Sequence, residues 1–297
     1  MLIRRLYLFI SFLNLFAAIG LVYGHDQALT MYRQRFGRRY QQSYPTIVVD
    51  QSGRGNFKTI QSAIDSLPAR NNTDWVCIQV KAGKYNEQVH IPPSKQFIYL
   101  KGEGKKKTIV VSSGSLNIAT SPTFNSEADN ILVRGMSFWN SYNNPFKDGK
   151  SISPAVAARI IGDKAAFYRC GFYGFQDTLW DVQGRHYFKQ CSIQGAVDFI
   201  FGAGQSLYEK CTISVITRGL KGMAGYITAQ GRTSAKDTNG FVFKDCNVVG
   251  NGLVYLGRPW RDYARVIFYN TSLPSIVVPE GWHNWNTQLS ASTGYLT

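Results

Sequence analysis

The chain has 297 residues, of which 44% are hydrophobic, 14% aromatic and 17% charged. This composition excludes a disordered polyelectrolyte and a membrane protein with several spans. The formal net charge of +15 favours a polyanionic partner, and the charge alone leaves nucleic acid, an anionic membrane and an acidic polysaccharide open.

Residues 1–24 have the pattern of a secretory signal peptide. Arg4 and Arg5 precede an apolar run that ends at Leu21, and Gly24 is a small residue before polar sequence. The run is short for a membrane span, so we expect cleavage rather than an anchor. The prediction is a secreted, extracellular protein without a membrane segment after cleavage, and this compartment disfavours nucleic acid as the partner.

Residues 25–44 contain several Arg among Gln and Tyr without hydrophobic alternation, which is typical of a flexible basic arm. We expect the folded domain to comprise 45–297. Two N-x-[ST] sequons make Asn71 and Asn270 candidate glycosylation sites. The five cysteines are too few for a disulfide scaffold, and an odd number leaves at least one unpaired.

Short β-rich runs between Gly, Asn and Asp turns begin at Thr46. The exception is 59–67, where apolar residues at helical spacing predict one short amphipathic helix that ends before Pro68. Strands are predicted at 46–50, 75–80, 97–100, 108–111, 130–133, 165–168, 186–188, 206–208, 240–243 and 265–269.

An internal repeat occupies the second half of the chain. Each copy has aromatic or apolar residues, a polar step, a cysteine (Cys170, Cys191, Cys211 or Cys246) and a second alternating strand. Strand repeats of about 20–25 residues without intervening helices indicate a single-domain, all-β parallel solenoid. An antiparallel sandwich is disfavoured because no Asn-Gly-type hairpin turns join the strands.

Equivalent positions of successive solenoid coils stack about 4.8 Å apart. We therefore expect the first three repeat cysteines to form a buried row, and the sequence leaves open whether an adjacent pair is oxidised.

Two acids lie within aromatic, Gly-rich runs. Asp177 and Asp198 are 21 residues apart, and each follows a repeat cysteine by seven residues, so equal coils would stack them on one face. Two carboxylates that close cannot both ionise cheaply, and one can act as an acid while the other is a nucleophile or base. Arg258 can keep one of them ionised. The alternative is that each Asp only caps a turn.

Other catalytic motifs are absent. The sequence has no G-x-S-x-G, H-E-x-x-H or C-x-x-C, and its four histidines lack ligand spacing, so we predict no metal and no cofactor. We interpret His186 as a packed or surface histidine. The run 101–107 is interpreted as a solvated turn, because it lacks the spacing and the following helix of a phosphate loop.

The sequence resembles the pectin methylesterases (pectinesterases) over 46–282. The matching motifs are Gly83-Lys84-Tyr85-Asn86-Glu87, 174–179, 198–202 and Leu256-Gly257-Arg258-Pro259-Trp260. This resemblance implies a right-handed parallel β-helix that removes methyl esters from pectin (homogalacturonan) in the cell wall, releasing methanol and pectate. The chain resembles the plant type without an inhibitor-like pro-region, and we expect a monomer.

The resemblance also implies roles for single residues. Asp198 would be the nucleophile, and Asp177 would protonate the departing methanol and then activate water. Gln176 would donate its amide to the oxyanion, and Arg258 would orient Asp198. Aromatic faces suit pyranose rings, and the residues implied to line the sugar groove beside Arg258 are Trp180, Phe201, Tyr255, Trp260 and Trp282.

Two features depart from the family pattern. Pro154 replaces the Gln of the usual Gln-Ala-Val-Ala run, and proline offers no donor. Loss of one oxyanion donor costs on the order of 10²–10³ in rate. The sequence after Trp282 is also short and polar compared with the family. Both features motivate an alternative, a catalytically weak homologue that acts as a basic pectin-binding wall protein. A lyase or polygalacturonase is disfavoured because the acid sets they need are absent.

Overall fold

The computed structural model describes residues 44–69, 74–115, 117–143 and 152–285. The predicted signal peptide, nearly all of the basic arm and Asn71 lie outside these ranges. Within them, no helix is long and apolar enough to cross a membrane.

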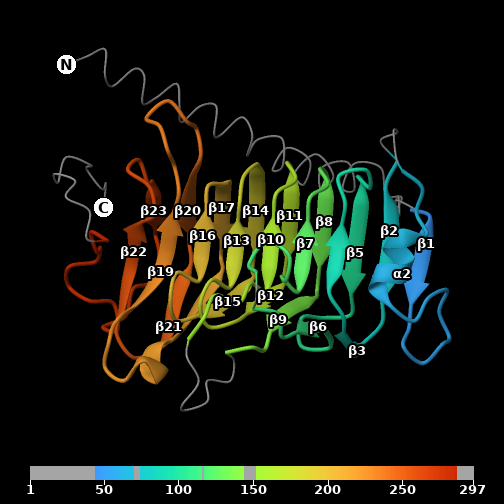
Figure 1. Cartoon of the computed structure of the whole chain (residues 1–297), viewed down its shortest axis with the longest axis horizontal. Helices are drawn as coiled ribbons and strands as arrows, with labels where there is room; N and C mark the ends of the chain where they lie inside the picture. Colours follow the sequence, from blue (N-terminus) through green and yellow to red (C-terminus); the bar gives the residue numbers. More distant parts are fainter. Residues whose placement is uncertain (1–43, 70–73, 116, 144–151, 286–297) are drawn as a thin grey trace, which may run out of the picture. The chain divides into compact units, whose positions relative to one another are not determined.

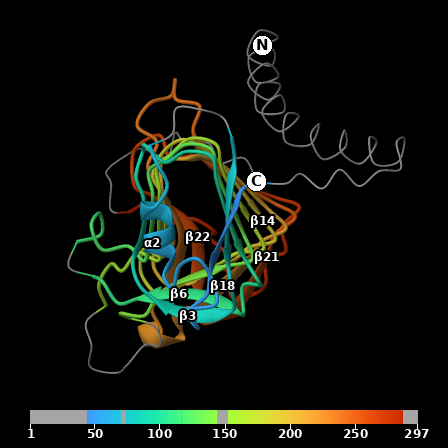
Figure 2. The same ribbon diagram turned by 90° about the vertical axis from the view of Figure 1, so that its right-hand side faces the viewer.

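Three parallel sheets form the walls of a solenoid, and each coil runs from sheet A through sheet B to sheet C (Figures 1 and 2). In the described ranges, sheet A contains, in spatial order, β1 (Thr46–Val49), β2 (Val76–Val80), β5 (Ile98–Gly102), β8 (Ile131–Arg134), β11 (Ala165–Tyr168), β14 (Arg185–Lys189), β17 (Gln205–Glu209), β20 (Gly240–Lys244) and β23 (Val266–Tyr269). Sheet B contains β3 (Gly83–Asn86), β6 (Thr108–Ser112), β9 (Ser137–Asn140), β12 (Gly171–Tyr173), β15 (Ser192–Gly195), β18 (Thr212–Ile216) and β21 (Asn247–Asn251). Sheet C contains β4 (Val89–Ile91), β7 (Phe124–Ser126), β10 (Ala158–Ile160), β13 (Leu179–Asp181), β16 (Ile200–Gly202), β19 (Gly225–Gln230) and β22 (Val254–Pro259).

This architecture confirms the predicted parallel β-helix. Every predicted strand is present, with bounds that differ by two residues at most. The predicted short helix is α2 (Ile60–Asp65), in which the Thr59 side chain accepts a hydrogen bond from the Ser62 amide. The carboxylate of Glu87 caps the same end by accepting from the amides of Ile60 and Gln61, both at 2.9 Å. One 3₁₀ turn, η1 (Thr217–Leu220), follows β18.

The interior contains a continuous row of stacked aromatic rings from neighbouring sheet A strands. The ring centroids of Phe167 and Phe188 are 5.0 Å apart, and those of Phe188 and Tyr208 are 4.6 Å apart. The row continues to Phe243 and Phe268 at 4.6 and 4.5 Å. Each such pair contributes about 0.5–1.5 kcal/mol beyond its buried area, so the row ties successive coils together.

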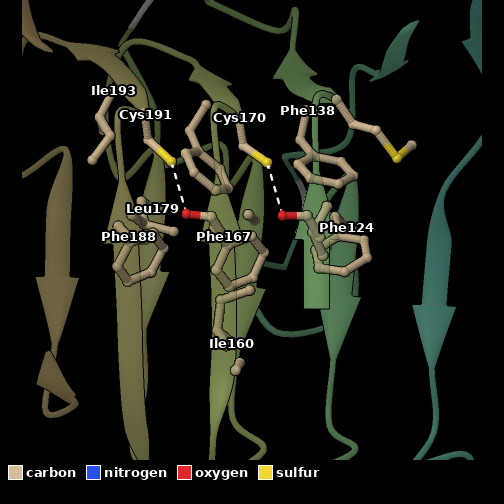
Figure 3. Close-up of a cluster of buried hydrophobic side chains, with 14 of the residues drawn as sticks. Phe124, Phe138, Ile160, Phe167, Cys170, Leu179, Phe188, Cys191 and Ile193 are labelled. Atoms are coloured by element: carbon tan, nitrogen blue, oxygen red, sulfur yellow. Dashed lines mark hydrogen bonds between the residues drawn. The ribbon is translucent and has the colours of Figure 1, made fainter. Parts of the chain in front are cut away.

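The repeat cysteines form the predicted buried row, which extends to Cys246. Figure 3 shows two members of this row, Cys170 and Cys191. Each thiol donates to a carbonyl of the preceding coil, as Cys191 Sγ does to Phe167 O at 3.4 Å and Cys211 Sγ to Phe188 O at 3.4 Å. All five cysteines are free and buried. They act as small apolar residues that also satisfy backbone carbonyls.

His186 is packed in the interior rather than at the surface. Its Nδ1 lies 2.6 Å from Asp181 Oδ1, and its Nε2 lies 2.9 Å from the carbonyl oxygen of Gly162. The hydroxyl of Tyr208 donates to Asp181 Oδ2 at 2.7 Å. We call Asp181, His186 and Tyr208 the interior polar cluster.

The corners between sheets use residues with left-handed backbone. Asp177 (φ 58°) and Asp198 (φ 46°) occupy such positions between sheets B and C, and Arg169 (φ 54°) and Gln190 (φ 55°) occupy them between sheets A and B. Asp tolerates this conformation better than most residues. Both candidate catalytic acids therefore lie in turns that lead directly into sheet C.

Candidate active site

Asp177 and Asp198 are in register on adjacent coils. Gln176 and Val197 form a parallel bridge, and the Asp177 amide donates to Val197 O at 3.0 Å. One strand spacing of about 4.8 Å separates neighbouring coils. The stacking that the 21-residue spacing predicts is therefore present.

Arg258, on β22, reaches Asp198 from two coils away. Its Nε donates to Asp198 Oδ1 at 2.8 Å and its Nη2 donates to Oδ2 at 2.5 Å. Ala229 lies between Phe201 and Arg258 in the strand register, and its small side chain leaves room for the guanidinium to pass. This two-pronged ion pair fixes the orientation of the carboxylate.

Two aromatic rings flank the Arg258 guanidinium, and the sequence analysis identified neither. The Arg258 Cζ lies 4.0 Å from the ring centroid of Tyr226 and 3.7 Å from that of Trp285. Cation–π contacts of this kind stabilise a partly desolvated cation. Tyr226 and Trp285 thus fix the position of Arg258, which in turn orients Asp198.

The two carboxyl groups have different electrostatic environments. Burial, with the charge of Asp198 adding to it, raises the pKa of Asp177 to about 8, although Arg258 opposes the shift. Burial also raises the pKa of Asp198, while the hydrogen bonds and charge of Arg258 lower it. Asp198 is only 5% exposed and directly bonded to a cation. Near neutral pH this arrangement favours a protonated Asp177 beside an ionised Asp198.

Aromatic side chains line the outer face of sheet C next to the acids. Trp180 stacks on Phe201 with centroids 5.3 Å apart, and Phe201 meets Trp260 edge-on at 5.9 Å. Trp285 packs against the same outer cluster. Gly231 permits this packing, because a Cβ there would lie 2.9 Å from the Trp260 ring. The result is a row of flat faces alongside the carboxylates, in which Trp180, Trp260 and Trp285 are half-buried and Phe201 is buried.

The other two predicted groove aromatics lie apart from this row. Tyr255 stacks on Tyr226 at 5.5 Å and so supports Arg258 indirectly. Trp282 packs against the main core, with its ring 6.2 Å from that of Phe268.

Gln176, the candidate oxyanion donor, and the run that begins at Pro154 lie on neighbouring coils. Gln176 is half-buried, and its side-chain amide forms no hydrogen bond with another described residue. The backbone carbonyl oxygen of Gln176 accepts a hydrogen bond from the Ala155 amide at 3.1 Å. This contact places the run after Pro154 beside the acids. The structure therefore brings together Asp177, Asp198, Gln176 and Arg258 with Trp180, Phe201 and Trp260.

Two further sequence-based expectations concern ligands and modification. The exposed Asn270 uses its side-chain amide to donate to Asp245 Oδ1 at 2.7 Å, and its glycosylation stays a prediction. Over the described ranges, no group of three His, Cys, Asp or Glu residues has the arrangement needed to hold a metal ion.

Comparison with known proteins identifies the family. The family model for pectinesterases matches residues 46–297. The chain is 57% identical over 251 residues to probable pectinesterase 29 of Arabidopsis thaliana, covering 83% of this chain and 74% of the relative. Pectin methylesterase from carrot superposes with a TM-score of 0.74 at 30% identity, covering 82% of this chain and 77% of that one. A pectin methylesterase in complex with a hexasaccharide shares the fold, with a TM-score of 0.71 at 24% identity, covering 86% of this chain and 93% of that one.

The chain belongs to the pectinesterase family. Membership supports an esterase that demethylesterifies pectin.

Proposed function

We propose that this protein is a secreted hydrolase that removes methyl esters from homogalacturonan, with Asp198 as nucleophile and Asp177 as acid and base. The observation that supports it most is the pairing of an Arg258-bound Asp198 with an adjacent Asp177 whose pKa is raised to about 8. Secretion rests on the signal-like residues 1–24.

In the first step, a carboxylate oxygen of Asp198 attacks the carbonyl carbon of the methyl ester. The carbonyl oxygen becomes an oxyanion, which the amide of Gln176 stabilises by hydrogen bonding. The carbon–methoxide bond then breaks, and the leaving oxygen takes the proton of Asp177. Methanol departs, and the sugar carboxyl is joined to Asp198 as an acid anhydride.

In the second step, Asp177 is ionised and removes a proton from water. The resulting hydroxide attacks the anhydride at the sugar carbonyl, and the bond to Asp198 breaks. Asp198 leaves as a carboxylate and Asp177 is protonated again. The sugar carboxylic acid that forms gives its proton to solvent and becomes a galacturonate unit. Arg258 favours this step because it stabilises the departing carboxylate.

The outer aromatic row supplies binding of the sugar chain. Trp180 and Trp260 present partly exposed flat faces against which pyranose rings can stack. Because the row crosses successive coils, we expect the polysaccharide to lie along the solenoid axis.

One observation favours a second candidate, a pectin-binding wall protein with little turnover. Pro154 replaces a residue that supplies an oxyanion donor in the family pattern, and proline has no side-chain donor.

Methanol release from methyl-esterified pectin by the purified chain separates the two functions. The esterase is supported if the wild type releases methanol and Asp198→Asn does not, while Asp65→Asn, an exposed acid on α2, keeps wild-type activity. Pectate binding without turnover, unchanged in Asp198→Asn, would establish the binding protein instead.

A further inference from the structure

A second, strongly basic groove lies away from the active site, at the corner where sheet A turns into sheet B. It has a volume of about 690 Å³, and its charged and polar lining residues are Lys101, Glu103, Lys105, Arg134, Arg169 and Gln190. Sheet B separates this corner from the turns that contain Asp177 and Asp198. We call it the A–B corner groove.

The cations of the groove come from successive coils. Lys101 and Arg134 are paired in the strand register, and Arg134 pairs with Tyr168, which directly precedes Arg169. The Nε of Arg169 donates to Gln190 Oε1 at 3.0 Å on the next coil. With about 4.8 Å between coils, positive charges repeat along the solenoid axis.

The charge of the groove is not cancelled from within. Glu103 forms an ion pair with Lys81 at 3.1 Å and accepts from the Ala82 amide at 2.9 Å. Among the described residues, neither Lys101 nor Arg134 forms an ion pair, and both are exposed. Both cations are therefore available to an external anion.

The floor of the groove is glycine backbone. A Cβ on Gly102 would lie 2.4 Å from the Gly135 carbonyl oxygen, and the Gly104 amide donates to that oxygen at 2.9 Å. Lys105 lies across the coils, because its Nζ donates to Ser192 Oγ at 2.7 Å. These glycines thus let neighbouring coils pack closely beneath the cations.

We propose that the A–B corner groove is a second binding site for de-esterified homogalacturonan. This linear polymer has a carboxylate on each sugar, which matches cations repeated along the axis better than a compact anion does. The choice of ligand rests on the proposed function, because the de-esterified chain is the product of that reaction. The groove retains the enzyme on product while the active site remains free for methylated chain.

The test compares binding to immobilised polygalacturonate with turnover of a short methyl-esterified oligogalacturonate. Arg134→Gln/Arg169→Gln removes two groove cations, and Lys58→Gln/Lys164→Gln removes two exposed lysines elsewhere as a control of equal charge. At low salt we expect roughly tenfold weaker binding for the groove variant and less than about twofold for the control, with the difference shrinking as salt rises. Methanol release from the short substrate should be unchanged in both variants.

Equal losses of binding in the two variants would overturn the proposal, since net charge alone would then explain retention. No loss in the groove variant would overturn it as well. Lys101→Gln guards against a folding defect, because this single exposed change should weaken binding by itself while leaving the melting temperature unaltered. Groove-dependent binding in a wild type that releases no methanol would contradict the proposed esterase and leave the groove site standing.

Discussion

The two carboxylate clusters of this protein lie close together in the chain and differ in how their charges are satisfied. In the interior polar cluster, both oxygens of Asp181 are occupied, one by His186 and one by Tyr208. In the active site, both oxygens of Asp198 are held by Arg258, but the side chain of Asp177 has no hydrogen-bond partner among the described residues.

The protonation of His186 follows from its partners. Both ring nitrogens face acceptors, a carboxylate and a backbone carbonyl, and this arrangement favours the doubly protonated imidazolium. Burial lowers the pKa of His186, but the charge and hydrogen bond of Asp181 outweigh it and raise the pKa above its ordinary value. The comparison teaches that Asp181 has no free side within the interior polar cluster, whereas Asp177, beside the Arg258-bound Asp198, has an open side from which a proton can be transferred.

The largest effect is expected from Asp198→Asn. Loss of a nucleophile removes the covalent route, and methanol release should fall by at least about 10⁴-fold. Because the change also removes the charge partner of Arg258, it should lower the free energy of unfolding, and methanol release is therefore compared per folded molecule. Activity within tenfold of wild type would contradict the assigned role.

Asp181→Asn tests the structural role of the interior polar cluster. Removal of the charge partner leaves a buried imidazolium unpaired, and the expected loss is about 3–5 kcal/mol in the free energy of unfolding. Denaturant titration measures it, while methanol release per folded molecule should stay near wild type. The matched control is Asp163→Asn, which breaks a more exposed ion pair with Arg185 and should cost less than Asp181→Asn, because both partners remain accessible to water.

Trp285→Ala removes one of the two rings against Arg258. A less firmly held guanidinium stabilises ionised Asp198 less, so kcat/KM should fall roughly tenfold. In the pH profile of kcat/KM, the acidic limb should move to higher pH, because the pKa of Asp198 rises. Trp282→Ala provides the comparison, because Trp282 packs against the core and its loss should lower Tm without moving that limb. Identical effects of both variants would refute the positioning role of Trp285.

Pro154→Gln is expected to give the smallest effect, a several-fold gain in kcat. The new amide would add an oxyanion donor next to Gln176, below the 10²–10³ that a fully aligned donor provides. Steady-state methanol release at saturating substrate measures the gain. An unchanged kcat would show that the donor missing at 154 does not limit the reaction.

The fold could be predicted from the sequence mainly because the strands of sheet A show a clear pattern. Its strands are four or five residues long with regular alternation, as in β14 and β17, so the period of two is visible. Sheet C strands such as β13 and β16 have only three residues, too few for a periodicity. The run around Asp177 and Asp198 was recognised instead by its repeat spacing, which is why the acids were identified and their strands were not.

The contacts of Tyr226 and Trp285 with Arg258 could not be predicted from the repeat spacing, for a physical reason. Tyr226 stands one coil beyond Asp198 in the register, but the segment containing η1 lengthens this coil and breaks the 21-residue spacing. Trp285 belongs to the segment after the last coil, where no repeat fixes positions, and the family resemblance pointed to the neighbouring Trp282 instead. A motif locates the acids, whereas the partners of Arg258 depend on how the chain end folds back.

The pH dependence of kcat/KM for methanol release is the most direct test of the central claim, that Asp177 holds a proton beside an ionised Asp198. Because kcat/KM reports the free enzyme, we predict a fall as pH rises through about 8, where Asp177 loses its proton. On the acidic side, kcat/KM should fall as Asp198 becomes protonated, at a pH above the ordinary range of an aspartate because burial raises its pKa. After subtraction of spontaneous ester hydrolysis, a rate that stays constant or increases between pH 7 and pH 10 would contradict the account.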